Sequence, residues 1–143
     1  MIDRRVRVPP DKVEIINKLR YSEDNKNGIF KQYSDILSFC ATLGYKYDRF
    51  NPFDEGSSSV DPIRQDVFER SGQDKLFYLL AYARTGDPEC LSNSEQAEKT
   101  RIEIFEAYAN GGLEILRERL HGREDPLDFI LLMISRERNG SIH

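Results

Sequence analysis

Four glutamates at helical spacing are the residues of this sequence best suited to chemistry. They are Glu103, Glu106, Glu114 and Glu118. Pairs three and four residues apart could bring their carboxylates to one metal ion, as a metal-dependent nuclease requires. Several arginines lie beside them, so ion pairing along a helix surface explains the same pattern. We favour ion pairing and expect no metal site.

Other catalytic groups are scarce. The only histidines are His121, which falls at an expected helix end, and His143, the last residue. Cys40 and Cys90 lack the spacing of a zinc site or of a disulfide framework. No phosphate-binding glycine motif is present. The sequence therefore predicts a protein that is not an enzyme, needs no cofactor and works in the reducing cytoplasm.

Basic residues gather in two places. Residues 1–9 form a basic arm with Arg4, Arg5 and Arg7, which could be a short strand, a disordered tail or a contact for nucleic acid or an acidic partner. Lys46 and Arg49 alternate with aromatic residues, as in single-strand nucleic-acid sites, although the same segment could fold back over a helical core.

The overall charge argues against one large basic face. The net charge is −4, with 10 Lys/Arg against 7 Asp/Glu in residues 1–50 and 11 against 18 in residues 51–143. A small autonomous DNA-binding protein usually has an excess of cations. Arg101 interrupts an apolar helix face, so it either pairs internally with a carboxylate or contacts a partner.

Hydrophobic periodicity predicts an all-α domain of about five to six helices over residues 10–143. Spacings of three and four residues place helices at 10–19, at 30–44 with Gly44 as the closing residue, and at 73–84 with Leu79 widening the buried stripe. Residues 54–60 are acidic and then rich in Gly and Ser, which favours a mobile loop. The structure of residues 54–70 is left open.

The stretch 92–120 is expected to organise the fold as a helical corner. Ser92 and Glu95 have the spacing of a capping box at the start of its first helix. Gly111 and Gly112 are expected to end that helix, with one of them at positive φ, and to turn the chain into a second helix.

A last helix is predicted from Asp125, which would cap it ahead of Pro126. Its residues 127–134 are apolar nearly all round, so this helix is either central to the core or shared in a homodimer. No apolar run approaches the roughly 20 residues that a membrane-spanning helix needs.

The string from Arg101 to Leu116, followed by Asp125 to Asp128, resembles DNA phosphorothioation (Dnd) system-associated protein 4. Segments 41–46 and 79–87 are similar in the same order. The resemblance implies an accessory or adaptor protein of a bacterial DNA modification or restriction (defence) system, with other proteins of that system as partners. It supplies no catalytic residue. The alternative is a small DNA-binding regulator that uses the basic arm with Lys46 and Arg49.

Overall fold

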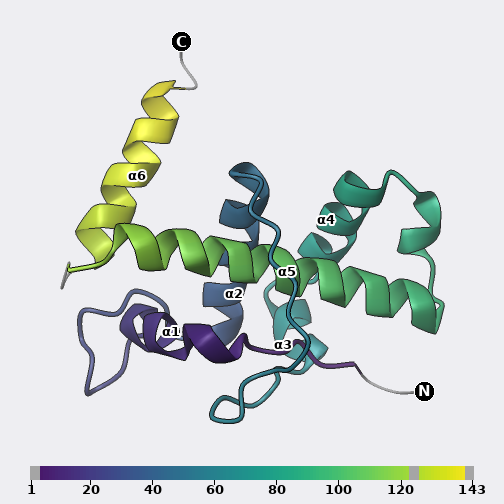
Figure 1. The fold of residues 1–143 in the computed structure, drawn as a ribbon, viewed down its shortest axis with the longest axis horizontal. Helices are drawn as coiled ribbons and strands as arrows, with labels where there is room; N and C mark the ends of the chain where they lie inside the picture. The colour runs from purple at the N-terminus through teal and green to yellow at the C-terminus, as the bar shows by residue number, and fades with distance from the viewer. Residues whose placement is uncertain (1–3, 123–125, 141–143) are drawn as a thin grey trace.

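One long helix, α5 (Glu95–Arg119), is the element on which the rest of the chain packs (Figure 1). The computed structural model describes residues 4–122 and 126–140. Within these ranges the protein has six α-helices, two 3-10 turns and no strand, which confirms the predicted all-α class. At 1.5 Å per residue, α5 is about 37 Å long and spans the molecule.

The other helices lie close to where periodicity places them, except the short helix at residues 65–70, in the segment whose structure the sequence leaves open. Gly86 ends α4 (Lys75–Thr85) in the left-handed conformation, with φ of 66°. The predicted cap Asp125 lies outside the described residues. The remaining elements are η1 (Pro10–Lys12), α1 (Val13–Leu19), α2 (Tyr33–Lys46), α3 (Gln65–Arg70), α4 (Lys75–Thr85), η2 (Pro88–Leu91) and α6 (Pro126–Gly140).

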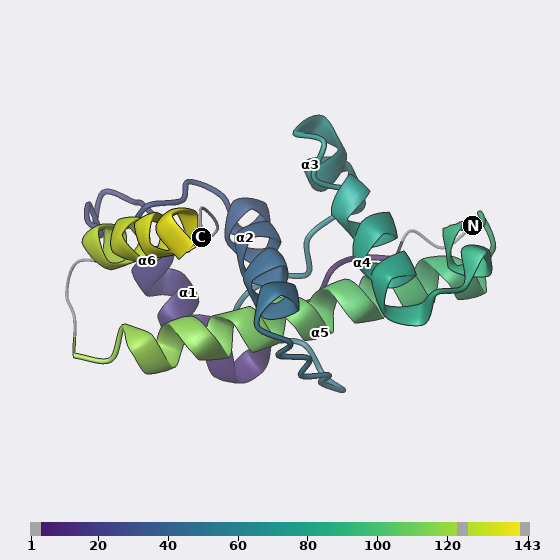
Figure 2. The ribbon, with the colours of Figure 1, turned by 90° about the horizontal axis from the view of Figure 1, so that it is seen from above.

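The predicted glycine corner is wrong. Helix α5 runs without interruption through Gly111 and Gly112, and neither glycine has positive φ. A Cβ on Gly111 would overlap the carbonyl oxygen of Arg49, and one on Gly112 would overlap that of Cys40. The glycines are there because the backbone of α2 and of the turn after it approaches α5 at this point (Figure 2).

Gly44 has the same role on the facing helix. The helix does not close at Gly44 but continues to Lys46, and a Cβ on Gly44 would overlap the carbonyl oxygen of Tyr108. Glycines on both helices therefore let α2 and α5 cross at close range. The crossing replaces the predicted corner as the organising feature of the fold.

The start of α5 also differs from the prediction. Ser94 is the N-cap residue, and its Oγ accepts a hydrogen bond of 3.1 Å from the backbone N–H of Ala97. Ser92 instead closes η2, and its hydroxyl lies 3.1 Å from that of Ser94. Residues 92–94 thus connect the end of η2 to the start of α5 at Glu95.

The described part of the basic arm, residues 4–9, is packed against the body of the protein. Val6 and Val8 are buried, and Val6 exchanges two backbone hydrogen bonds of 2.8 Å with Ile63. The arm therefore lies between α5 and the segment that leads into α3. A cluster of three aromatic rings fills the core nearby, with centroids 4.7–5.5 Å apart; these are Phe68, Phe77 and Phe105.

Candidate functional site

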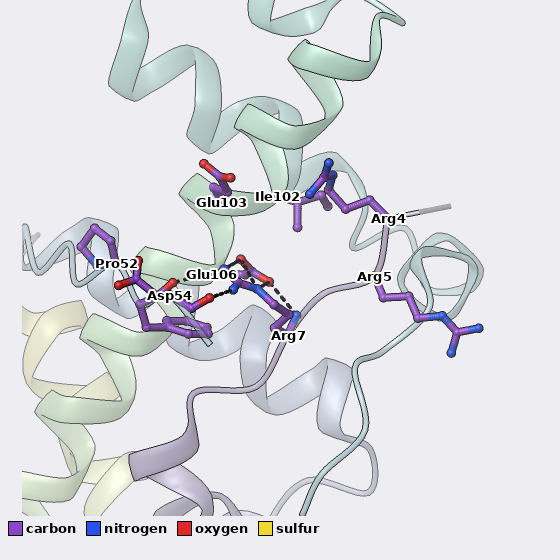
Figure 3. A pocket seen from close by; sticks show the side chains of 9 residues that line it. Arg4, Arg5, Arg7, Pro52, Asp54, Ile102, Glu103 and Glu106 are labelled. Carbon is purple, nitrogen blue, oxygen red and sulfur yellow. Dashed lines mark hydrogen bonds and ion pairs between the residues drawn. The ribbon is translucent and has the colours of Figure 1, made fainter. Parts of the chain in front are cut away.

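A cavity of about 330 Å³ lies where the basic arm meets α5 (Figure 3). Its charged lining is balanced, with three arginines from the arm and three carboxylates from α5 and the loop after α2. These charged residues are Arg4, Arg5, Arg7, Asp54, Glu103 and Glu106. A single-sign ligand such as a free phosphate therefore has no net attraction to the cavity as a whole.

Arg7 and Glu106 form the wall of this cavity and bind each other. Nη2 of Arg7 donates to Glu106 Oε1 at 2.8 Å, Nε donates to Oε2 at 3.1 Å, and the backbone N–H of Arg7 donates to Oε2 at 2.6 Å. The hydrogen bond to Glu106 and the nearby carboxylates raise the pKa of Arg7 against the opposing effect of burial. The Glu106 side chain is only 2% exposed, so the pair belongs to the fold rather than to a free binding site.

Arg4 and Arg5 differ from Arg7 because their guanidinium groups have no partner among the described residues. The backbone around them is nevertheless fixed. The N–H of Arg4 donates to Glu98 at 3.4 Å, and its carbonyl accepts a hydrogen bond from Gln65. In Figure 3 the Arg4 side chain lies near Ile102, and the end of the Arg5 side chain extends away from α5. The arm therefore presents two available cations from an ordered backbone.

Lys46 and Arg49, the other predicted contacts, lie at and just after the end of α2. Arg49 is paired with two carboxylates of α5, Glu114 at 3.3 Å and Glu118 at 3.2 Å. Hydrogen bonding and charge attraction from Arg49 lower the pKa of Glu118. Lys46 is exposed. The positive charge of Arg49 is thus compensated locally, which reduces the attraction of this segment for phosphates.

The aromatic rings of this segment cover the body of the protein. Phe50 packs edge-on against Tyr108 at 5.0 Å between centroids, and the guanidinium of Arg84 stacks 3.4 Å from the Phe50 centroid. Arg84 also donates to the Tyr108 hydroxyl at 3.2 Å. This arrangement agrees with the structural alternative offered by the sequence.

Arg101 is buried and bound internally, but its partners are not the carboxylate that the sequence suggested. Its Nη1 donates to the backbone carbonyls of Cys90 at 2.8 Å and Ser92 at 2.7 Å. The guanidinium also lies 4.4 Å from the ring centroid of Tyr78. Arg101 therefore ties η2 and α4 to α5 and is not available to a partner.

The four glutamates singled out by spacing do not converge. Glu106 binds Arg7, Glu114 and Glu118 bind Arg49, and Glu103 lies 3.9 Å from Lys99. Among the side chains that the structure describes, in residues 4–122 and 126–136, no group of three or more His, Cys, Asp or Glu is placed to hold a metal ion. His121 is exposed, and His143 is outside the described residues.

Large apolar side chains are exposed at both ends of α5. At one end the exposed residues are Leu79 and Tyr82 of α4 and Leu91 of η2, which we name together the α4 surface. Leu79 is 64% exposed, so the expectation that it widens the buried stripe is wrong. At the other end, α6 exposes four apolar residues: Leu127, Leu131, Leu132 and Ile134. Periodicity predicts that α6 is either central to the core or shared in a homodimer, and it gives no sign of the exposed residues of α4 and η2.

Comparison with known proteins gives one match. The sequence model of the family described as DNA sulphur modification system-associated protein 4 matches residues 5–143. The chain belongs to this family. No curated protein and no solved structure matches it significantly.

Membership of the DNA sulphur modification system-associated protein 4 family confirms the resemblance carried by residues 101–116 and ties the chain to a DNA sulphur modification (Dnd) system. None of the helices in the described ranges combines the length and apolar character needed to cross a membrane.

Proposed function

We propose that this protein is a non-enzymatic adaptor of a bacterial DNA sulphur modification system, acting in the cytoplasm through contacts with other proteins of that system and with a second copy of itself. The modification or restriction activity that it assists would serve defence against foreign DNA. One observation carries the proposal: apolar side chains are exposed at two separate ends of α5, and an adaptor needs two contact surfaces.

The α4 surface suits a protein partner. Leu79 and Tyr82 lie three residues apart on α4 and so share one face. Tyrosine is a frequent energetic centre of interfaces because its ring buries a large apolar area while its hydroxyl keeps a polar partner. Covering one leucine contributes about 1.5–3 kcal/mol, which is enough for a few such residues to support specific binding.

The charged groups support contact with proteins more than contact with DNA. Arg7, Arg49 and Arg101 are all bound within the fold. The protein as a whole is acidic, with net charge −4. Steered association with a phosphate backbone therefore has little electrostatic support.

The adaptor is tested by affinity purification of the tagged protein co-expressed with the other proteins of its system. We expect at least one of them to co-purify, and Leu79→Glu to reduce its recovery more than about tenfold, equivalent to about 1.4 kcal/mol. Leu132→Glu, an exposed leucine outside the α4 surface, is the matched control. Failure of every system protein to co-purify, or equal recovery with Leu79→Glu, would reject the proposal.

A DNA-binding regulator is the second candidate, and the availability of Arg4 and Arg5 is the observation that favours it. Mobility shifts at several salt concentrations test this candidate. Affinity falls as salt rises, and each phosphate contact makes the slope of log affinity against log salt steeper by about 0.9. In the Arg4→Ala/Arg5→Ala variant this slope should be shallower by about the value of two phosphate contacts. Arg64→Ala, which removes an arginine already paired with Asp66, should change it less. No shift even at low salt would exclude this candidate.

A further inference from the structure

A hollow of about 320 Å³ lies between the end of α4, η2 and the first turns of α5. It carries the carboxylates of Asp87 and Glu89, and none of the described residues that line it is a cation. The other polar residues of the lining are neutral: Thr85, Ser94, Gln96 and Thr100. We name it the acidic hollow. It attracts positive charge, whereas the lining of the cavity beside the basic arm is balanced.

The two carboxylates of the acidic hollow are held by the turn that follows α4. Thr85 Oγ1 accepts a hydrogen bond of 3.2 Å from the backbone N–H of Asp87. Asp87 Oδ1 in turn accepts one of 3.0 Å from the backbone N–H of Glu89. Both acidic side chains are exposed, and neither forms an ion pair with another described residue. They are therefore available to a cation from outside the chain.

Cations near the acidic hollow do not neutralise it. The guanidinium of Arg84 stacks on an aromatic ring of the segment after α2, and Lys99 lies 3.9 Å from Glu103. Arg101 is buried behind η2 and carries one positive charge. Two glutamates in the first turn of α5 also offset the positive end of the helix dipole. The exposed carboxylates around the hollow outnumber the buried guanidinium; they are Asp87, Glu89 and Glu95.

The acidic hollow borders the α4 surface. Tyr82 lies three residues after Leu79, and Thr85 of the hollow lies three residues after Tyr82, so each side chain is next to the previous one on α4. Leu91 directly follows Cys90, which also lines the hollow. Exposed apolar side chains therefore lie beside the carboxylates, and Tyr82 lies between the hollow and Leu79.

We infer that the α4 surface and the acidic hollow together bind one continuous segment of another protein of the modification system, in which a lysine or arginine lies beside apolar side chains. The cation enters the hollow at Asp87 and Glu89, and the apolar side chains cover Leu79 and Tyr82. The ring of Tyr82 can add a cation–π contact. The inference rests on the proposed function in assigning the α4 surface to a protein partner, and it adds the chemistry of that partner.

Charge also gives the segment a direction along α4. Lys75 lies four residues before Leu79 on the same face and is exposed. Its charge repels a cation at that end of the α4 surface, whereas the acidic hollow attracts one at the other end. Complementary charges of this kind fix the register of an interface. A free metal ion or a polyamine would leave Leu79 uncovered, so the apolar residues favour a protein segment.

Dissociation constants test the inference, with the system protein that co-purifies with the tagged wild type as the probe. At about 50 mM sodium chloride, Asp87→Asn/Glu89→Gln should bind it at least about fivefold more weakly than the wild type, and the loss should shrink at about 500 mM. Asparagine keeps an oxygen that accepts from the backbone N–H of residue 89, so the turn is preserved. Circular dichroism checks that the variant remains folded.

Glu23→Gln/Asp24→Asn is the matched control. It removes the same two charges from exposed carboxylates in the loop after α1, and α1 contacts the other end of α5. It should bind the probe like the wild type. Wild-type affinity of Asp87→Asn/Glu89→Gln, or equal losses in the two double variants, would overturn the inference. The adaptor would still stand in that case if Leu79→Glu weakened the same complex.

Overlapping peptides of the same system protein test the chemistry of the segment. Peptides that bind the wild type should contain a lysine or arginine within one helical turn of apolar residues, and should lose binding when that cation is replaced by glutamine. They should also fail to bind Leu79→Glu. Peptides of this chain on the same array report binding of a second copy. Binding only to peptides without a cation, only to peptides of this chain, or to none would overturn the inference.

Discussion

Arg7 and Glu106 are 99 residues apart in the sequence, yet the guanidinium of one meets the carboxylate of the other at 2.8 Å. The contact fixes the basic arm against the middle of α5. It also explains why Glu106 can be buried on a helix face that otherwise contacts the core. A buried carboxylate is tolerated when a counter-charge and several hydrogen bonds compensate for its lost hydration.

Removing Arg7 should therefore destabilise the protein more than neutralising Glu106. Arg7→Met leaves a carboxylate that is 2% exposed without its cation, for which we expect a loss of about 3–5 kcal/mol in the free energy of unfolding. Glu106→Gln keeps the shape of the side chain and some of its hydrogen bonds, so we expect a smaller loss of about 1–3 kcal/mol in the free energy of unfolding. Urea unfolding followed by circular dichroism measures both.

The double variant Arg7→Met/Glu106→Gln is the control for this pair. With both charges removed, it should recover part of the stability lost in Arg7→Met. A double variant as unstable as the sum of the single changes would show that the two residues act independently.

Replacing a glycine at the crossing of α2 and α5 should change the stability of the protein. The direction of the change shows whether the glycine is needed for close packing or is only a poor helix former. Gly112→Ala adds a Cβ against the carbonyl of Cys40, so we expect a loss of about 3 kcal/mol or more. If Gly112 were only a poor helix former, alanine would instead stabilise the protein by about 1 kcal/mol. Thermal unfolding decides between them.

Gly72→Ala is the comparison for Gly112→Ala. Gly72 has φ of 78° and nothing lies within 4 Å of an added Cβ. Alanine there should therefore destabilise the protein only by the cost of the left-handed backbone, about 1–2 kcal/mol. Equal losses at both positions would contradict the close approach of α2 to α5.

Much of the secondary structure is predictable from the sequence because it depends on local spacing. The apolar pattern of residues 10–19 matches η1 and α1, and that of residues 73–84 matches α4 to within about two residues. Gly86 ends α4 because a left-handed residue closes a helix locally. These features need no knowledge of the rest of the chain.

The errors arise where distant segments decide the outcome. Adjacent glycines suggest a turn, but here the backbone of α2 occupies the space that a side chain would fill. Nothing near Arg7 indicates that its partner is Glu106. The apolar spacing of a helix does not show how much of its surface other elements cover, so the spacing predicts that Leu79 is buried although most of its side chain is exposed. The connection of this chain with a DNA sulphur modification system comes from the family match and not from any of these contacts.

The Arg49–Glu118 pair should make a small, pH-dependent contribution to stability. The hydrogen bond from Arg49 lowers the native pKa of Glu118 below its ordinary value of 4.5. Such a carboxyl stabilises the native state above the unfolded pKa, and the contribution is lost as the pH falls through the lower native pKa. The urea midpoint of the wild type should therefore exceed that of Glu118→Gln at pH 6 and converge with it near pH 3.

Salt provides the control for the Glu118 experiment. The pair is exposed, so about 1 M sodium chloride should screen it and reduce the difference at pH 6. A difference that persists unchanged in salt, or that grows as the pH is lowered, would contradict this account of Glu118.

The Cys40 thiol should be unreactive in the folded protein. Cys40 is fully buried in α2 at the crossing with α5, and burial raises its pKa far above that of a free thiol. Because the thiolate is the reactive form, a Cys90→Ala variant should react with a thiol reagent only when it unfolds. We expect labelling slower than that of a free cysteine by several orders of magnitude, and full labelling in urea. Rapid reaction without denaturant would mean that α2 separates readily from α5, contrary to the tight crossing that the three glycines permit.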